Sequence, residues 1–442
     1  MTSNRNIHVL PANTLSNGIV SHRHGNPVLR FEIGEREEYL LGHTLRLCGR
    51  FSAFRNASTD GSGIVPTEDT NQYMSDKLGV YSVLESVAFS TMKTKQNLES
   101  IRNYNTFLGS YLPCKSSKSQ SMTFMNNQAL IMPNFESQRL SIVNNEKTKT
   151  GGNSFCLPLV SGLTSGQNPI PLSSQWGIGG LEISINLAPD SNVFYSGDDT
   201  SASFSNAYYE LSDLYLVAET VLPSPDQLSQ LMRSPSNTFE FNTITSFYQT
   251  INSTNAIVNL NLGQSNVLGV FGSFVPVSFL NNLTQNGLSS LYPRNLGTAP
   301  AVIRSAIFNR ANERFPIHYN LDTMQKDNAS IESAPIDIVK NFMDAMDNFI
   351  NLEATSITPA NNRVISSNAV GLDYKKVPLG GMTAGIGCVY DKISGNGVSF
   401  KNVPFSLQLE TDLTTDNPNA LYLFVHSRNT LVSKNGSIQI MT

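Results

Sequence analysis

Side chains that could carry out chemistry are few in this sequence, and their spacing matches none of the common catalytic patterns. The chain has no GxSxG elbow, no phosphate-binding GxxxxGK[ST] loop, no HExxH and no EF-hand loop. His22 and His24 are the only close pair among the six histidines, and they lie near the N-terminus, where a solvated tail is expected. We therefore predict no catalytic, cofactor-binding or metal site, and a protein that is not an enzyme.

Two further groups resemble functional motifs only in part. Asp198 and Asp199 lie in a loop with Gly and Ser, which is typical of a solvated turn rather than an acid/base pair. A glycine-rich stretch near residue 380 lacks both the spacing and the following helix of a nucleotide-binding loop, so we expect strand ends and bulges there. Its glycines are Gly380, Gly381, Gly385 and Gly387.

The cysteines indicate free thiols. Residues 1–10 contain no apolar signal-peptide core, so we expect synthesis in the cytosol, where thiols stay reduced. No CxxC pair is present, so the sequence indicates neither a zinc site nor a redox motif. We expect buried free thiols rather than disulfides at Cys48, Cys114, Cys156 and Cys388.

The surface must be polar but weakly charged. Only 14% of the 442 residues are charged, well under the usual quarter, and the formal net charge is −4. A protein that wraps nucleic acid with its main surface should be basic, so weak or no direct nucleic-acid binding is expected. No apolar run reaches the roughly 20 residues of a membrane span. Since Lys and Glu are depleted at protein interfaces, the composition favours a subunit covered by neighbours over a secreted lectin-like or fibre protein.

The dominant hydrophobic period is two, which is the period of β-strands. Leu181, Ile183, Ile185 and Leu187 alternate with polar residues, and the same pattern recurs at 405–413 and 45–51. Gly, Pro, Asn and Asp separate these runs from others. Further strands are expected at 214–221, 256–262, 267–279 and 421–426.

Helices are expected to be few. Apolar residues follow helical spacing at 335–352 and at 97–112, where Leu98, Ile101, Leu108 and Leu112 form one stripe. A short helical stretch at 226–232 is bracketed by prolines, which is typical of a linker between domains. Asn435-Gly436 indicates a type I′ hairpin turn.

The first 27 residues are predicted to be an N-terminal arm. They show little periodicity, and Arg5 and Arg23 are present while no acid occurs before Glu32. We expect no separate core in this arm. A frayed terminus and a weakly basic segment that faces nucleic acid are the alternatives, and we favour packing against a neighbouring subunit.

The two sides of the 223–235 linker repeat one plan. Each half has early strands, a helical segment, a Gly-rich stretch, an alternating strand, a polar loop and a last apolar strand. Many short antiparallel strands with one buried face can pair two sheets about 10 Å apart. We therefore expect an all-β protein made of two tandem β-sandwiches, at 28–222 and 236–442.

Two stretches of the first half carry a more specific resemblance. The first is SDKLGVYSVLESVAFST with QNLESIRNYNTFLGSYL, at 75–112. The second is LPLVSGLTSGQNPIPLSSQWGIGGLEISINLAPD with YYELSDLYLVAETV, at 157–221. Both resemble the first jelly roll of double jelly-roll major capsid proteins, especially those of polinton-like viruses and virophages. The second half matches in length and element order only.

The resemblance implies a fold and a role. The fold would be a double jelly roll with a few short helices in loops and in the linker. The role would be a virion protein, made in the host cytosol, whose homotrimers form pseudo-hexagonal capsomers. These would tile an icosahedral shell around double-stranded DNA, together with penton and other minor capsid proteins.

Two alternatives come from other classes. A carbohydrate-binding fibre or adhesin would need aromatic side chains clustered on an exposed sheet, yet the one tryptophan, Trp176, lies in a run assigned to packing. A sandwich-fold glycoside hydrolase would need two carboxylates facing each other in a cleft. No feature of the sequence indicates such a pair.

Overall fold

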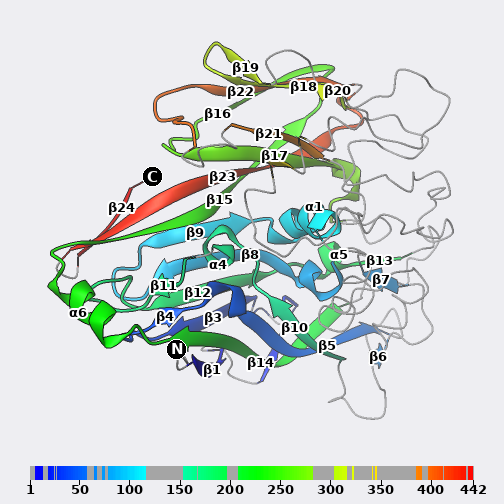
Figure 1. The fold of residues 1–442 in the computed structure, drawn as a ribbon. Helices are drawn as coiled ribbons and strands as arrows, with labels where there is room; N and C mark the ends of the chain where they lie inside the picture. Colours follow the sequence, from blue (N-terminus) through cyan, green and yellow to red (C-terminus); the bar gives the residue numbers. More distant parts are fainter. Residues whose placement is uncertain are drawn as a thin grey trace.

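The computed structural model shows a protein built almost entirely of β-strands, as predicted. Figure 1 shows the strands stacked in layers, with the first half of the chain below and the second half above. The structure describes residues 5–12, 18–23, 25, 27–56, 64–66, 72–74, 78–115, 153–166, 168–196, 208–281, 303–315, 321–322, 341, 344–345, 385–390, 397–411, 413–434 and 437–441.

The outer sheet of the first half has eight strands: β1 (Arg5–Pro11), β2 (Ile19–Val20), β4 (Tyr39–Leu40), β5 (Arg46–Asn56), β6 (Ile64–Pro66), β10 (Asn153–Pro158), β11 (Ile170–Pro171) and β14 (Tyr208–Val221). Its hydrogen-bonded order is β10-β5-β14-β4-β11, and all of these pairs are antiparallel. β1 and β2 pair with β14, and β6 pairs with β5.

Four antiparallel strands face this sheet in the order β9-β8-β12-β3: β3 (Val28–Ile33), β8 (Leu84–Thr91), β9 (Asn97–Arg102) and β12 (Leu181–Leu187). The apolar residues of β12 are all buried, as their alternation predicts. Ile183 of β12 and Leu47 and Phe51 of β5 belong to one core between the two sheets. A small two-stranded sheet of β7 (Gln72–Met74) and β13 (Phe194–Ser196) lies beside it.

The second half repeats the two-layer arrangement. Its inner strands are β15 (Asn237–Ile251), β17 (Val267–Pro276), β21 (Gly385–Val389), β23 (Asn419–Lys434) and β24 (Ser437–Met441). Its outer sheet is β16 (Asn255–Leu260), β18 (Ile303–Arg310), β19 (Glu313–Phe315), β20 (Leu321–Asp322) and β22 (Phe405–Thr411). Leu407 and Leu409 of β22 face inward as predicted, and they share a second core with Phe308 and Leu423.

β17 and the first part of β23, residues 419–427, are buried on both faces, which explains the mostly apolar runs at 267–276 and 420–425. Leu421, Leu423 and Val425 of β23 join the core of the second half. Tyr422 and Phe424, which point the other way, join the core of the first half. These strands therefore form a shared wall between the two halves of the chain.

One feature of the sheet differs from the expectation of two separate sandwiches. Ser100 of β9 and Thr245 of β15 form a single parallel bridge. This bridge joins the inner strands of both halves into one nine-stranded sheet. The two sandwiches therefore share backbone hydrogen bonding as well as side-chain packing.

The helices are short: α1 (Tyr104–Lys115), α4 (Gly162–Ser165), α5 (Asp190–Val193), α6 (Pro225–Arg233), and the 3-10 turns η1 (Gly42–Thr44), η2 (Gly79–Val83) and η4 (Val277–Phe279). The predicted helix at 97–112 is wrong in its first part, because Leu98 and Ile101 lie on β9. A helical stripe over so few residues also fits a strand that is buried on both faces. The chain turns at Asn103, which has a φ of 54°, and only then enters α1.

The predicted linker contains a helix. α6 begins with a capping box between Ser224 and Gln227 and has Pro225 in its first turn. None of its residues is buried, and Figure 1 shows it at the end of the molecule where β14 leads into β15.

Two other predicted elements lie wholly or largely outside the described residues. Of the predicted helix at 335–352, only residues 341, 344 and 345 are described, and all three are helical. The turn residues 435–436 are outside the described part of the chain. The flanking strands β23 and β24 do pair from Lys434 and Ser437 onward, as a two-residue hairpin requires.

The described part of the arm pairs with the first half of its own chain. β1 runs antiparallel to β14 from Arg5–Val221 to Pro11–Tyr215. Side chains also hold it, because Asn6 donates to Glu38 at 2.9 Å and the His8 ring lies 2.8 Å from the Thr220 hydroxyl. The arm thus has more strand character than its weak periodicity suggests, and its buried residues Ala12 and Val20 join the core of the first half. Bridging between subunits stays a prediction.

Candidate functional site

Aromatic side chains lock the two halves together at α1. Figure 1 shows α1 between the strands of the first half and the shared wall. The Phe107 ring centroid lies 5.4 Å from that of Phe424 and 6.1 Å from that of Phe271. Tyr111 also stacks on Phe107, with ring centroids 5.7 Å apart. Such pairs stabilise by area burial and by about 0.5–1.5 kcal/mol each beyond it, so this cluster resists separation of the halves.

A buried carboxylate ties the same junction through the backbone. Glu99 of β9 is only 3% exposed. Its Oε1 accepts hydrogen bonds from the backbone N–H of Gly162 at 2.9 Å and of Ile244 at 2.7 Å, while its Oε2 accepts from Leu163 at 2.9 Å. A side chain of the first half thereby satisfies a backbone donor of β15 in the second half. We call Glu99 and these three donors the junction carboxylate site.

The start of α4 supplies two of the donors because the sequence specifies a tight capped turn. Ser161 and Thr164 form a capping box, so the side chain of Ser161 accepts from the N–H of Thr164. The first helical N–H groups, at Gly162 and Leu163, stay free for Glu99. A Cβ on Gly162 would lie 2.7 Å from the backbone of Asn242, so only glycine allows α4 to approach β15.

The carboxyl group of the junction carboxylate site has a raised pKa. Burial raises the pKa of Glu99 to about 7, against the hydrogen bonds from Leu163, Ile244 and Gly162, which lower it. A junction between the two halves therefore contains a group that changes charge near neutral pH. No pattern in the sequence indicated this role, because Glu99 falls in the stretch predicted to be a helix, off the apolar stripe of that helix.

Further polar contacts span the junction along its length. The hydroxyl groups of Ser110 and Ser273 hydrogen bond to each other. Gln96 donates to the backbone oxygen of Ile438 at 3.1 Å, and Ser433 donates to that of Gln175 at 3.4 Å. The two halves are therefore positioned by directional bonds as well as by apolar packing.

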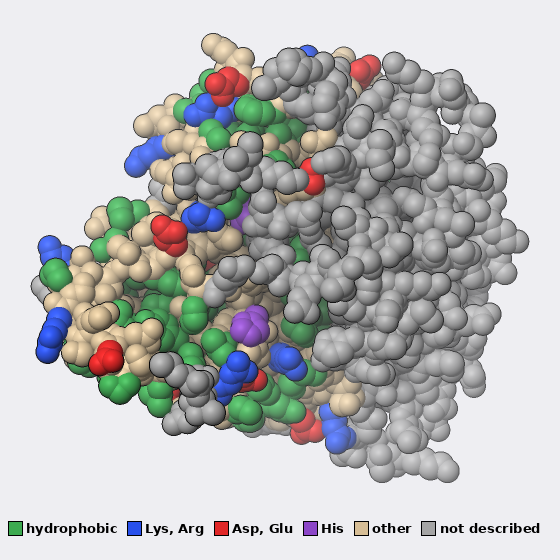
Figure 2. All heavy atoms as spheres, viewed as in Figure 1, with side chains coloured by type: hydrophobic (Ala, Val, Ile, Leu, Met, Phe, Trp, Pro, Cys, Tyr) green, Lys and Arg blue, Asp and Glu red, His purple; other side chains and the backbone are tan. Residues whose placement is uncertain are grey.

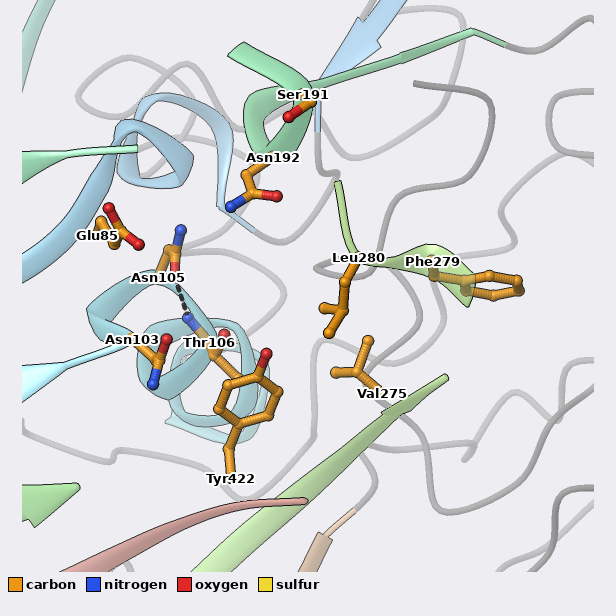
Figure 3. Close-up of a pocket in the computed structure, with 10 residues that line it drawn as sticks. All are labelled: Glu85, Asn103, Asn105, Thr106, Ser191, Asn192, Val275, Phe279, Leu280 and Tyr422. Carbon is orange, nitrogen blue, oxygen red and sulfur yellow. Dashed lines mark hydrogen bonds between the residues drawn. The ribbon is translucent and has the colours of Figure 1, made fainter. Parts of the chain in front are cut away.

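A pocket opens where the two halves meet. Figure 3 shows Asn105 and Thr106 from the first half facing Leu280, Val275 and Tyr422 from the second half. Its volume of about 40 Å³ holds a few water molecules. Pockets for small-molecule ligands are usually about 300–1,000 Å³, so this hollow has the size of a hydration site rather than a substrate site.

Exposed apolar side chains lie on edge strands of the described sheets. Ile7 and Val9 of β1 are 68% and 62% exposed, and Ile257 of β16 is 59% exposed. In Figure 2 the described part of the visible face shows hydrophobic and uncharged polar surface with few charged side chains. Such surfaces are typical of protein-protein interfaces.

The residues singled out from the sequence do not form a site. Gly385 and Gly387 lie on β21, as the strand reading predicts. His22 lies on the surface. His24, Asp198, Asp199, Gly380 and Gly381 are outside the described residues. Across the part of the chain that is described, no three His, Cys, Asp or Glu side chains gather as metal ligands would.

Trp176 is a packing residue, as expected. It is 2% exposed, its ring lies 4.9 Å from that of Tyr39, and its Nε1 donates to Glu37. It therefore offers no stacking surface to a sugar, and the carbohydrate-binding alternative is not favoured. Among the helices in the described ranges, none has the length and apolar character to cross a membrane.

Two cysteines that are distant in sequence meet in the outer sheet. Cys48 and Cys156 are directly opposed on β5 and β10, and their sulfur atoms lie 3.1 Å apart as free thiols. The sequence contained no spacing signal for this pair. Cys388 is buried in the second half.

The described architecture is that of a double jelly roll, and comparison with solved structures shows the same fold. The chain is similar to the Faustovirus major capsid protein, with a TM-score of 0.59, 8% identity and coverage of 97% of this chain and 90% of that chain. It is similar to a chain of the Sputnik virophage structure, with a TM-score of 0.56, 10% identity and coverage of 99% and 88%. It is also similar to the mavirus major capsid protein, with a TM-score of 0.50, 11% identity and coverage of 98% and 89%.

The comparisons agree with the resemblance seen in the sequence and extend it to both halves. The similarity covers the second half, which the sequence matched only in length and element order. No family model and no curated protein matches the sequence. With identities of 8–11%, the likeness establishes the fold.

Proposed function

We propose that this chain is the major capsid protein of a virus. The observation that carries the proposal is the similarity over nearly the whole chain to the major capsid proteins of Faustovirus and mavirus. The similarity spans both sandwiches and the connection between them. The chain divides, in this proposal, into an arm at 1–27, jelly rolls at 28–222 and 236–442, and a linker at 223–235.

The capsomer is a homotrimer in this proposal. Two jelly rolls in each of three subunits give a pseudo-hexagonal outline, and the outline is regular only if the two rolls of a subunit keep a fixed orientation. Phe107 and the junction carboxylate site supply that rigidity. The low charge and the exposed apolar residues on edge strands suit surfaces that neighbouring copies cover.

The assembled product is an icosahedral shell around double-stranded DNA, completed by penton and other minor capsid proteins. The protein is made in the host cytosol and acts in the virion as a structural protein, not as an enzyme. A net charge of −4 suits a shell that encloses DNA with weak or no direct binding.

Sedimentation of the purified full-length chain tests the trimer. We expect one species at three times the 48.4 kDa chain mass, persisting at micromolar concentration, because an obligate interface buries more than about 2,000 Å². Electron microscopy should then show six-sided particles. A monomer under these conditions, or trimers that never form shells or sheets at high concentration, would count against the proposal.

A further inference from the structure

Cys48 and Cys156 occupy a position suited to covalent pairing. They are 108 residues apart in sequence but face each other directly across the antiparallel strands β5 and β10. Directly opposed residues of an antiparallel pair share one face of the sheet, with Cα atoms about 4.5–5.5 Å apart. This lies inside the range of about 4.4–6.8 Å that disulfides span. The strands therefore need no rearrangement for a bond to form.

The surroundings of the pair favour a reactive thiolate. The hydrogen bond from Cys48, helped by Arg46 and opposed by burial, lowers the pKa of Cys156 to about 6. The same pairing, followed by burial, raises the pKa of Cys48. One sulfur is thus the better nucleophile, while its neighbour keeps its proton.

Cys156 is the member of the pair that solvent can reach, while Cys48 is buried. β10 lies at the end of the strand order of its sheet, and the side chain of Cys156 is only half-buried. Tyr215 of β14, the residue paired with Cys48 on its other side, is 38% exposed. Small oxidants can therefore reach Cys156, in contrast to the buried Cys388.

We propose that Cys48 and Cys156 form a redox-sensitive pair that closes into a cross-strand disulfide when the folded protein meets a peroxide. The Cys156 thiolate attacks one peroxide oxygen, the O–O bond breaks, and Cys156 becomes a sulfenic acid as hydroxide leaves. The Cys48 sulfur then attacks the sulfenic sulfur, and its proton and the leaving hydroxide form water. In total two thiols are oxidised, and one hydrogen peroxide is reduced to two waters.

The bond would fix β10 to β5. A cross-link between residues so far apart in sequence strongly restricts the unfolded chain, so the oxidised protein should resist unfolding more than the reduced protein. The pair stays open in a reducing cytosol and closes in an oxidising medium. This chemistry depends only on the fold of the outer sheet and would hold whether or not the chain builds capsids.

Peptide mapping of the wild-type protein tests the proposal without any variant. The fully reduced, folded full-length protein is exposed to a small excess of hydrogen peroxide, free thiols are blocked by alkylation, and the digest is analysed by mass spectrometry without reduction. We expect a linked Cys48–Cys156 peptide, loss of two thiols per chain, and a rise in Tm of roughly 5 °C that dithiothreitol reverses.

Single variants separate this pair from other thiol chemistry. Cys48→Ser should abolish the cross-link and the Tm rise and leave Cys156 as a sulfenic acid that dimedone traps. The matched control Cys388→Ala should keep both the linked peptide and the Tm rise. The proposal is overturned if Cys48 and Cys156 are both alkylated when the oxidised protein is denatured before the reagent is added, or if either pairs instead with Cys114 or Cys388.

Discussion

The carboxylate of Glu99 accepts a hydrogen bond of 2.7 Å from the backbone N–H of Ile244. The two residues belong to different halves of the chain and to strands joined by a single parallel bridge. This one contact places an acidic side chain of the first jelly roll in the backbone bonding of the second. It joins the two sandwiches together with the β9–β15 bridge and the aromatic contacts of Phe107.

Removing the carboxylate should weaken this junction. Glu99→Ala leaves the N–H groups of Gly162, Leu163 and Ile244 without their acceptor in a buried site. An unsatisfied buried donor costs about 1–3 kcal/mol, so we expect the free energy of unfolding at pH 5 to fall by roughly 3 kcal/mol or more, measured by urea denaturation. Glu240→Ala, on the exposed face of β15, is the control and should change it by less than about 0.5 kcal/mol. Equal losses in both variants would contradict the role of Glu99.

The same site should make stability depend on pH. The pKa of Glu99 is about 7 in the folded protein, above its ordinary value of 4.5, so the folded state binds the proton more tightly than the unfolded state. Its contribution is fully present below about pH 4.5 and is lost as the pH rises through 7. Against Glu99→Gln, which does not titrate, the wild type should lose up to about 3 kcal/mol of relative stability between pH 4.5 and 8. A constant difference across this range would show that Glu99 titrates normally.

Unlike Glu99, His426 should make the protein less stable as the pH falls. It is fully buried on β23, and burial, together with Arg428, lowers its pKa to about 3. The neutral ring is therefore favoured in the folded state, and stability present above pH 6.5 is lost as the pH falls toward 3, by up to about 5 kcal/mol. His426→Gln should flatten the fall in the free energy of unfolding between pH 6.5 and 4. If the free energy of unfolding of His426→Gln falls as steeply between pH 6.5 and 4 as that of the wild type, groups other than His426 cause the loss.

The assignment of Ile183 to the core face of β12 can be tested by introducing a charged side chain. Ile183 is fully buried between the two sheets of the first half, so Ile183→Asp should abolish soluble folding, since an unpaired carboxylate there has no solvation. Ser184→Asp, on the opposite face of the same strand and paired with Arg30, should fold normally. Soluble expression and thermal melting distinguish the two, and a normal melting curve for Ile183→Asp would refute the strand assignment.

The arm should matter for assembly. Deleting residues 1–27 should leave trimers that fold but weaken shell formation, and it should lower Tm because β14 loses the strand pairing of β1. The double variant Ile7→Ser/Val9→Ser keeps that pairing and removes only exposed apolar side chains. It should keep the wild-type Tm and still assemble poorly, as scored by electron microscopy. If the deletion variant or the double variant forms shells as readily as the wild type, the arm does not contact neighbouring subunits.

The class of fold follows from residue patterns within short segments of the chain. A period of two in segments such as 181–187 and 405–411 requires a strand with one buried face, because successive side chains point to opposite sides. Those residues are buried where predicted, because strand geometry puts the alternate apolar side chains on one face and that face packs against the opposite sheet. The linker helix was also predictable, because prolines and a capping serine act within one turn. The repeated order of elements predicted two sandwiches.

How the sandwiches meet depends on contacts between residues that are distant in the sequence. The segment at 97–102 is a strand rather than a helix because it pairs with β8 and is covered by the other half, and no local preference of its residues reports either contact. Glu99, Phe107 and the Cys48–Cys156 pair acquire their roles from residues more than 100 positions away. The register between distant strands depends on which segments pair when the chain folds. The residue pattern within one segment does not indicate its partner.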